Sequence, residues 1–578
     1  MDVHRHQREK YFLVDDGNIL ESDGRGGAQS RVPSAEESQT AFRFSRMSKQ
    51  KGVQVSEGLR VKLAEAMTTG SGPAPDPDSQ PGIPAGYTYL GQFVDHDLTL
   101  DRTQVALGDP VPVEELLQGR SPALDLDSLY GMGPDHASSS RFYEVDGRLK
   151  TGDALGVGFP PSFPPANTDQ KGFDLPRAGA TAPGTKADQR APLIPDARND
   201  ENLIVGQLHL AFIHFHNRVV QRLAVGGRPV PEVFRASRDL VVKHYQWILR
   251  TDFLPRIVDP AIVDDVFTNG RRHFEVPGPV GQPGEHPTMP IEFSVAAYRF
   301  GHSMIRAGYQ WNRVFRTGGP GGVATLGALF RFSGTSGNLS VGPDDLSDLD
   351  DPNSGDLLRL PSNWITDWRR LFDFGSAGRT DLAVPAVEFN VAKRIDTLLV
   401  DPLTTLPTGT FEGRGKPAPP PLHRNLAFRN LARAGMVELA TGPQLAAQMG
   451  IRPLTEQQIV DGAGGARLTG LTAAERAELV AHTPLWFYIL REAEVNANHP
   501  GLLTGVGGRL VAEVFHRSID GSRISIIREP GWRPTLPAHR AGSFTMADLL
   551  LFAFENDANR LNPLGDGPLP AAGGGAAA

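Results

Sequence analysis

Cysteine is absent from this sequence of 578 residues. The chain can therefore form no disulfide bond and can offer no thiolate ligand to a metal. The absence leaves the cellular compartment open, because an exported protein can also lack cysteine.

Long apolar runs are missing as well. No stretch of about 18 apolar residues occurs, and the polar residues 1–10 are not followed by the apolar core of a secretory signal. We therefore expect a soluble chain without a transmembrane segment or a standard signal peptide. Such a chain is either cytoplasmic or exported by a non-classical route.

Positive charge is not in excess either. Lys and Arg number 58 against 66 Asp and Glu, which gives a formal net charge of -8 at pH 7. A chain with this balance lacks the basic surface that attracts a phosphate backbone, so we expect no nucleic-acid partner.

The composition is that of a globular protein, with 39% hydrophobic and 21% charged residues. Apolar residues at helical spacing predict a largely helical chain. The predicted helices cover residues 56–67, 203–224, 231–253, 291–305, 364–372, 387–399, 455–460, 472–491, 510–516 and 545–556. The helix over 231–253 is expected to end before Pro255.

The segments between these helices are rich in glycine, proline and polar residues. Asp146-Gly147 predicts a hairpin over residues 142–150, and residues 152–192 and 318–361 are predicted loops. We expect residues 1–40 to be an extended or disordered lead-in and residues 561–578 to be a low-complexity tail.

The stretch of most chemical interest is residues 89–101, which contains Gln92, Asp95, His96 and Asp97. On a helix, successive side chains diverge by about 100°, so the two carboxylates and the imidazole cannot share one target. This geometry favours one residue for each of three neighbouring sites over a single metal clamp. Taken alone, the pattern fits a solvated helix face equally well.

Three further segments carry candidate site residues. Residues 121–127 place oxygen donors at alternate positions, as a hard cation prefers, although an acidic surface loop looks the same. Arg198 and Glu201 precede a helix, where such a pair is more often a surface ion pair or a capping acid. His302 follows small residues that allow a flat ligand to approach, but a lone histidine there is usually a core residue. For His209, His214 and His216 we expect packing roles, or roles in supporting a neighbouring ligand, rather than a non-haem metal site.

The segment Gly-Gln-Phe-Val-Asp-His-Asp-Leu-Thr around His96 resembles the distal-histidine signature of the peroxidase–cyclooxygenase superfamily. This superfamily contains the animal haem peroxidases, or myeloperoxidase-like enzymes. Arg198-x-x-Glu201 and Arg-Phe-Gly-His-Ser-Met-Ile around His302 follow in the family order. The resemblance implies a mainly α fold, a single large domain over residues 41–560 with few short strands and long loops, and a member of the bacterial type.

The resemblance also implies roles for individual residues. It implies haem b with His302 as the iron ligand, and calcium bound near the distal histidine. The implied catalytic residues are His96, Arg198 and Gln92, and the implied haem-binding residues are His302, Asp95, Glu201, Arg299 and Asn430. Asp95 and Glu201 would link covalently to the haem, whereas Asn202 gives no sulfonium link. The implied calcium ligands are Asp97, Ser121, the Ala123 carbonyl, Asp125 and Asp127, of which Ser121 and Asp127 replace the usual threonine and serine.

The implied function is a haem-dependent peroxidase that reduces hydrogen peroxide through a ferryl intermediate, with a role in the response to oxidative stress. Its small donors would be halides, thiocyanate or phenols. The alternatives are a haem fatty-acid dioxygenase and a non-catalytic, calcium-stabilised interaction protein. The dioxygenase relatives carry a radical-forming tyrosine three residues before the proximal histidine. Here that position is Arg299, and Tyr298 would be turned away by about 100° on a helix. The sequence leaves the oligomeric state open.

Overall fold

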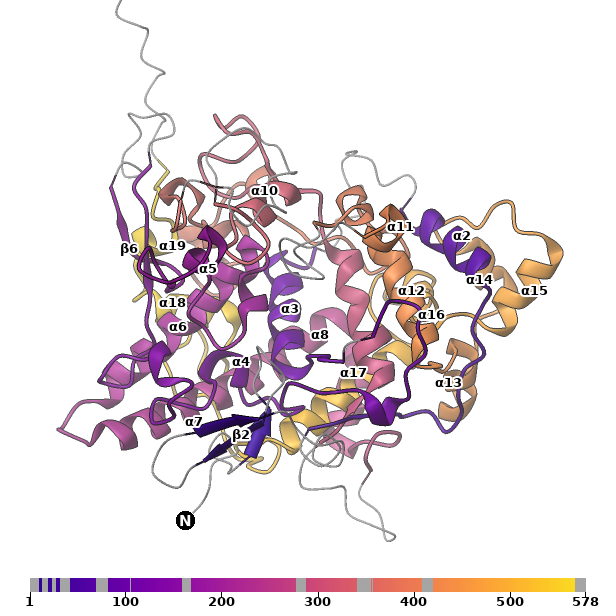
Figure 1. The fold of residues 1–578 in the computed structure, drawn as a ribbon, viewed down its shortest axis with the longest axis horizontal. Helices are drawn as coiled ribbons and strands as arrows, with labels where there is room; N and C mark the ends of the chain where they lie inside the picture. Colours follow the sequence, from indigo (N-terminus) through magenta and orange to yellow (C-terminus); the bar gives the residue numbers. More distant parts are fainter. Residues whose placement is uncertain are drawn as a thin grey trace, which may run out of the picture.

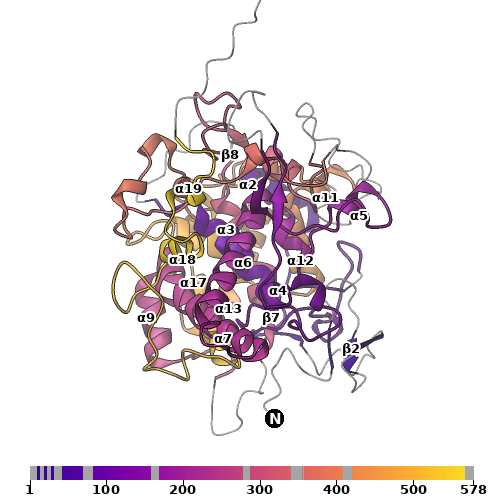
Figure 2. The ribbon, with the colours of Figure 1, turned by 90° about the vertical axis from the view of Figure 1, so that its left-hand side faces the viewer.

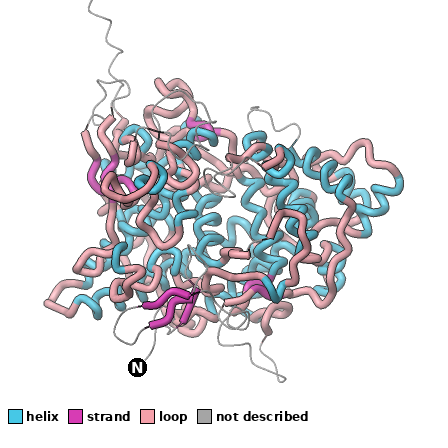
Figure 3. Tube along the Cα trace, in the orientation of Figure 1, coloured by secondary structure: helices cyan, strands magenta, loops and turns pink. Residues whose placement is uncertain are grey.

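The computed structural model describes residues 10–12, 19–22, 28–31, 42–68, 82–103, 105–157, 168–276, 287–339, 355, 357–407 and 419–566. Helices make up most of its regular structure, and the strands are short and lie at the periphery (Figures 1 and 3). The predicted mainly α fold with few short strands is confirmed. In the described part of the chain, no helix has the length and apolar character that a membrane span requires.

The strands form four small sheets. β1 (Lys10–Phe12), β2 (Ile19–Ser22) and β3 (Ala28–Arg31) make an antiparallel sheet within the expected lead-in. The two-stranded sheets pair β4 (Phe44–Ser45) with β7 (Met289–Pro290), β5 (Gly152–Ala154) with β6 (Gln170–Asp174), and β8 (Gly308–Tyr309) with β9 (Ala324–Thr325). The two predicted loops therefore contain short strands. The hairpin at Asp146-Gly147 is confirmed by the antiparallel bridge between Tyr143 and Leu149.

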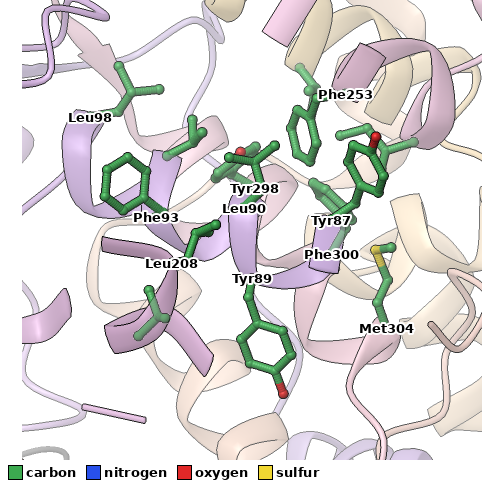
Figure 4. Close-up of a cluster of buried hydrophobic side chains, with 14 of the residues drawn as sticks. Tyr87, Tyr89, Leu90, Phe93, Leu98, Leu208, Phe253, Tyr298, Phe300 and Met304 are labelled. Atoms are coloured by element: carbon green, nitrogen blue, oxygen red, sulfur yellow. The ribbon is translucent and has the colours of Figure 1, made fainter. Parts of the chain in front are cut away.

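Helix α3 (Gly86–Leu98) runs through the interior, between α6 (Leu203–Leu223) and α12 (Leu426–Met436) (Figure 1). Its aromatic and aliphatic side chains are buried among residues of several other elements, such as Leu208 and Phe253 (Figure 4). Phe93 of α3 stacks on Phe212 of α6 with ring centroids 4.6 Å apart. A helix buried on most of its surface holds its few polar side chains in fixed positions, because close packing leaves little room for movement.

Helix α6 matches the helix predicted over 203–224. It packs against α3, against α7 (Val230–Ile248) and against α18 (Met546–Ala553) (Figure 2). The expected end before Pro255 is wrong. After α7 the chain continues through the π-helical turn Leu249–Phe253 into α8 (Leu254–Ile257), and Pro255 lies in the first turn of α8, where a proline breaks no helical hydrogen bond.

The continuous helix predicted over 291–305 is also wrong in detail. The segment is a π-helical turn, η6 (Glu292–Ala296), followed by a 3₁₀ helix, η7 (Ala297–Met304). Tertiary contacts impose this form: the buried Glu292 carboxylate accepts backbone N–H groups of Met47 and Ser48 at 2.9 and 3.0 Å. A 3₁₀ helix turns by about 120° per residue, so neighbouring side chains diverge more than on an α-helix.

Other predicted helices are divided or absent. The helix over 472–491 is two helices, α15 (Ala473–Ala481) and α16 (Leu485–Glu494), because Pro484 interrupts it. The helix over 364–372 is two 3₁₀ turns, Ser362–Trp364 and Trp368–Arg370. Only Ala386–Glu388 of the segment 387–399 is helical, because the following Asn390 side chain hydrogen-bonds to backbone carbonyl groups of other segments.

The remaining helical predictions are confirmed. They correspond to α2 (Glu57–Thr68), α14 (Glu456–Asp461), α17 (Gly505–Asp520) and α18. The other helices are α4 (Asp127–Tyr130), α5 (Lys186–Arg190), α9 (Pro260–Asn269), α10 (Leu326–Arg331), α11 (Pro421–Arg424), α13 (Gly442–Met449) and α19 (Ala558–Leu561).

Candidate active site

A cavity of about 420 Å³ lies between α3 and η7. It is lined from three directions: by α3, by the segment that leads into α6, and by η7 together with α12. The lining includes every residue that the sequence assigns to catalysis or haem binding: Gln92, Asp95, His96, Arg198, Glu201, Arg299, His302 and Asn430. Side chains more than 300 positions apart in the sequence thus meet at one cavity.

The His96 imidazole is buried, with 4% of the residue exposed. Its Nδ1 lies 2.9 Å from Oδ1 of Asn199, an oxygen that can only accept a hydrogen bond. Nδ1 is therefore the donor in this contact, and in a neutral imidazole Nε2 then has the lone pair. Oε1 of Glu201 lies 3.5 Å from Nε2. His96 is thus held in the tautomer that a general base requires.

Gln92 and Asn202 extend this network. Gln92 donates from Nε2 to Oε1 of Glu201 at 2.6 Å and accepts from Nδ2 of Asn202 at 2.8 Å. Asn202 is also the N-cap of α6, where its Oδ1 accepts from the Val205 N–H at 3.0 Å. The start of α6 therefore determines where Gln92 and Glu201 lie.

Arg198 is fixed by two acceptors. Its Nε and Nη2 donate to Oδ1 and Oδ2 of Asp196 at 3.1 and 2.7 Å, and Nη2 also donates to the carbonyl oxygen of His96 at 3.1 Å. Burial opposes ionisation of Asp196, but Arg120 and Arg198 outweigh it and hold the pKa of its carboxyl well below the usual range. The guanidinium of Arg198 is therefore anchored on one side and exposed to the cavity on the other.

His302, Asn430 and Arg299 form a chain on the opposite side of the cavity. Nδ2 of Asn430 lies 3.0 Å from Nδ1 of His302, and Nη1 of Arg299 donates to Oδ1 of Asn430 at 3.3 Å. Burial, with a contribution from Arg299, lowers the pKa of His302 to about 3, so its imidazole is neutral near pH 7. Burial lowers the pKa of Arg299 to about 10, which leaves it charged.

The cavity floor has space for a flat group. A Cβ atom placed on Gly301, beside His302, would have no atom within 4 Å. Asp95 faces the cavity from α3, and its Oδ1 accepts from the Thr99 hydroxyl at 3.0 Å. Two carboxylates, Asp95 and Glu201, thus line the same cavity from different elements.

Tyr298 also lines this cavity, as Arg299 does. Its ring stacks on Phe293, with centroids 4.6 Å apart, and its hydroxyl is buried without a hydrogen-bond partner among the described residues. Burial, with a contribution from Asp95, raises the pKa of this phenol.

The acidic segment 121–127 lies directly against α3. Asp97 is fully buried and accepts from the N–H groups of Leu126 and Ser128 at 3.2 and 3.3 Å. Oδ2 of Asp127 accepts from the Ser121 N–H at 3.1 Å, and Oδ1 lies 3.6 Å from Nη1 of Arg120. Within the described ranges, no three carboxylate or imidazole groups form a set able to hold a metal ion.

Burial is the main cause of unusual pKa values in this segment. Burial and the nearby Asp127 raise the pKa of Asp97 well above its ordinary value. Burial also raises the pKa of Asp127 to about 6, although Arg120 opposes the shift. The structure thus brings together the predicted calcium ligands as one acidic cluster, in which Asp97, Ser121, Ala123 and Asp125 are buried and the side chain of Asp127 is 14% exposed.

Three residues that contact this machinery were not predicted. Asn199 and Asp196 belong to the same short segment as Arg198, but the sequence gives no sign that their side chains turn inward. Arg120 looks like a surface residue beside an acidic loop, yet only 1% of its side chain is exposed. In each case the missing information is a long-range contact.

The helix α6 histidines have the packing environments that we expected. His216 lies between the Tyr130 hydroxyl and the Gly147 carbonyl, at 3.1 and 3.0 Å, and His214 lies 2.7 Å from the Gly172 carbonyl. His209 packs edge-on against Phe93, with ring centroids 5.8 Å apart.

Comparisons with known proteins point to one family. A family model described as animal haem peroxidase matches residues 92–318. A peroxidase-like protein of Margaritifera margaritifera is 32% identical over 154 residues, which cover 26% of this chain and 18% of that protein. Human thyroid peroxidase is 28% identical over 200 residues, which cover 33% of this chain and 19% of that protein. The matched region thus spans about a fifth of the length of these curated relatives.

Solved structures share the fold over most of the chain. Peroxidase A from Dictyostelium discoideum aligns with a TM-score of 0.53 and 15% identity, over 90% of this chain and 94% of that chain. The fatty acid alpha-dioxygenase of Oryza sativa aligns with a TM-score of 0.54 and 11% identity, over 98% and 87%. The cavity histidines, His96 and His302, both lie in the region of residues 92–318, and this region matches the animal haem peroxidase family.

Proposed function

We propose that this protein is a haem-dependent peroxidase that reduces hydrogen peroxide and oxidises small donors such as halides, thiocyanate or phenols. The observation that carries the proposal is the pair His96 and His302 on opposite sides of one cavity, with Arg198 beside His96. A base and a fixed cation on one side, and a neutral imidazole on the other, are the groups that peroxide cleavage at a haem requires.

The lining residues fit a haem. A neutral His302 is a suitable iron ligand, Gly301 leaves room beside it, and the cavity has aromatic and aliphatic walls. When bound, haem would supply the iron that takes up peroxide and the oxidising equivalents that pass to the donor. For His302 to bind iron through Nε2, its Nδ1 must carry the proton, so the Asn430 amide would present Oδ1 to His302.

His96 would move the proton. With Nδ1 held by Asn199, its Nε2 accepts a proton from peroxide and returns it to the leaving oxygen. Positioned acid–base groups contribute roughly 10²–10⁴-fold to such reactions. Glu201 lies 3.5 Å from Nε2, and as a free carboxylate, before any ester link to the haem forms, it would stabilise the imidazolium form between the two transfers. Gln92 would position a water molecule or a halide near His96.

Arg198 would stabilise the negative charge that develops as the O–O bond breaks. Its bidentate contact with Asp196 fixes the guanidinium in advance, so no reorganisation is needed during the reaction. Arg299 would supply a fixed positive charge at the other side of the cavity, beside His302 and Asn430. Asp95 and Glu201, whose carboxylates both line the cavity, would form ester links to haem methyl groups. Each link would be a two-electron oxidation in which the methyl group loses a hydrogen and hydrogen peroxide is reduced to water.

Calcium would bind at the acidic cluster. Carboxylates, a hydroxyl and a backbone carbonyl are the oxygen donors that this ion prefers. The raised pKa of Asp97 supports the proposal, because burial and a neighbouring carboxylate make a cation favourable there. Small movements of the segment 121–127 would have to direct the donors at one point.

A fatty-acid dioxygenase is the second candidate, and the observation that favours it is Tyr298. Its phenol lines the cavity without a hydrogen-bond partner among the described residues. Against it, Arg299 occupies the position three residues before His302, and an arginine cannot carry the radical that abstracts hydrogen.

The test is a spectrum of the purified protein, with and without peroxide, followed by turnover assays. His302→Ala should lose most of the haem, whereas His96→Ala should keep the haem and lose peroxidase activity. Full haem occupancy in His302→Ala would disprove the assignment. Rapid oxygenation of a fatty acid, abolished by Tyr298→Phe and without oxidation of small donors, would favour the second candidate.

A further inference from the structure

Arg120 connects the acidic cluster to the arginine of the cavity. Its Nε donates to Oδ2 of Asp196 at 3.0 Å, and its Nη2 lies 2.6 Å from the same oxygen. Its Nη1 lies 3.6 Å from Oδ1 of Asp127. Asp196 in turn holds Arg198. The order of contacts is therefore Asp127, Arg120, Asp196, Arg198 and the carbonyl oxygen of His96.

The two central residues of this series of contacts, Arg120 and Asp196, are inaccessible to water. The side chains of Arg120 and Asp196 are each 1% exposed, whereas that of Arg198 is 26% exposed on the cavity side. A buried charge whose partner is removed is costly, because water cannot replace the lost contact. The two buried groups therefore constrain each other strongly.

The charge balance of the acidic cluster and of the pair Asp196 and Arg198 also depends on Arg120. Asp127 stands where the family has serine and so adds a negative charge to the loop. Arg120 offsets that charge, because its Nη1 lies 3.6 Å from Oδ1 of Asp127 while its Nε and Nη2 bind Asp196.

We propose that Arg120 and Asp196 are positioning residues that hold Arg198 and couple it to the cation loop at Asp127. The coupling is mechanical, through Asp196, and electrostatic, through the charge that Arg120 shares between Asp127 and Asp196. The part that concerns Arg198 rests on the proposed function, whereas the contact of Arg120 with Asp127 does not.

A second aspartate, Asp367, makes the same contacts with two arginines elsewhere in the protein and can serve as a control. Asp367 caps a 3₁₀ turn, accepts from the Arg369 N–H and binds the Arg369 guanidinium, as Asp196 does with Arg198. A second arginine, Arg370, donates to Asp367 as Arg120 does to Asp196. Neither Asp367 nor its arginines line the cavity. Asp367→Asn thus removes an equivalent buried contact outside the cavity lining.

The first experiment measures thermal unfolding of the full chain, with and without CaCl₂, and needs no haem. Arg120→Met should lower Tm by roughly 3–5 °C, because it leaves Asp127 and Asp196 short of a buried partner. Adding Asp127→Ser should restore at least half of that loss. Calcium should raise Tm more in Arg120→Met than in the wild type, and less in Asp127→Ser. Additive effects of the two substitutions would overturn the coupling.

The second experiment titrates the haem-loaded protein with cyanide, an anion that the Arg198 side of the cavity would stabilise. Asp196→Asn should weaken cyanide binding by about tenfold or more, as expected for a lost charge-assisted contact. Asp367→Asn should lower Tm about as much as Asp196→Asn does, but it should bind cyanide as tightly as the wild type. Arg120→Lys should keep most of the wild-type affinity for cyanide. Unchanged cyanide binding in Asp196→Asn would overturn the positioning role. A wild type that binds no haem would instead overturn the proposed function, and the first experiment would still decide the role of Arg120.

Discussion

Asn199 offers the most direct test of how His96 works. Its Oδ1 accepts from Nδ1 of His96 at 2.9 Å, while its Nδ2 is buried without a hydrogen-bond partner among the described residues. Asn199→Asp therefore preserves the shape and the acceptor and loses no hydrogen bond that the structure describes for the amide. It replaces a neutral group by a carboxylate in contact with the imidazole.

The size of the effect follows from the burial of this pair, since His96 is 4% exposed and Asn199 fully buried. A carboxylate at this distance typically raises the pKa of a partner by about 1–3 units. Because His96 acts as a base only when neutral, the acid limb of the activity should move to higher pH by about 1–3 units. Asn199→Ala should instead lower kcat/KM at every pH by roughly 5–150-fold, the equivalent of about 1–3 kcal/mol for an unsatisfied N–H.

The assay is kcat/KM for hydrogen peroxide between pH 4 and pH 9 in the haem-loaded protein. Asn217→Asp is a matched control, because Asn217 lies on α6 and hydrogen-bonds to the backbone of Leu149, outside the cavity lining. Its pH profile should match that of the wild type. If Asn199→Asp keeps the wild-type acid limb, His96 is not the titrating base and the assigned tautomer has no catalytic role.

Three further predictions concern the cofactor, the cation and acid stability. After exposure to peroxide, acidic organic extraction should leave haem on the wild type and release it from the Asp95→Asn, Glu201→Gln double variant; complete release from the wild type would show that no ester forms. A calcium concentration about a hundredfold above Kd should stabilise the fold by roughly 2.7 kcal/mol, so chelation should lower Tm, and an unchanged Tm after verified removal would count against the site. Burial lowers the pKa of His209 to about 3 and that of His216 to about 4, below the value of about 6.5 in an unfolded chain. The contribution of each neutral imidazole to the free energy of unfolding, up to about 3 kcal/mol, is complete above pH 6.5 and is lost as the pH falls through the folded pKa. His209→Leu should therefore reduce the dependence of Tm on pH between 7 and 4. An unchanged dependence would contradict this.

The helical character of the fold could be predicted from the sequence because apolar residues recur at helical spacing, as they do over residues 203–224, which form α6. The segment 291–305 shows where this reasoning fails. Its apolar spacing is helical, but the buried Glu292 binds two N–H groups of a distant strand region, and the backbone adopts a π turn and a 3₁₀ helix. A contact between residues almost 250 positions apart leaves no sign in a local pattern.

The candidate site likewise contains residues that could be predicted from the sequence and residues that could not. His96, His302 and Asn430 could be predicted because each lies in a segment that resembles a family motif, and the structure places Asn430 3.0 Å from His302. Asn199 and Arg120 could not be predicted, because their importance comes from the atoms that they contact. The role of Asn199 follows from its contact with His96, and the role of Arg120 follows from its contacts with Asp196 and Asp127.

The short helix that precedes α6 explains why Arg198 and Glu201 both reach the cavity. In an α-helix, residues three apart diverge by about 60°, whereas in a 3₁₀ helix they are eclipsed. The turn Ala197–Asp200 is 3₁₀, with Asp196 as its N-cap and Glu201 as its C-cap, so Arg198 and Glu201 lie on one side. The Asn202 cap then starts α6 immediately afterwards. The geometry of the distal side therefore depends on the backbone form of one turn, and that turn is held by the bond between the carboxylate of Asp196 and the N–H of Arg198.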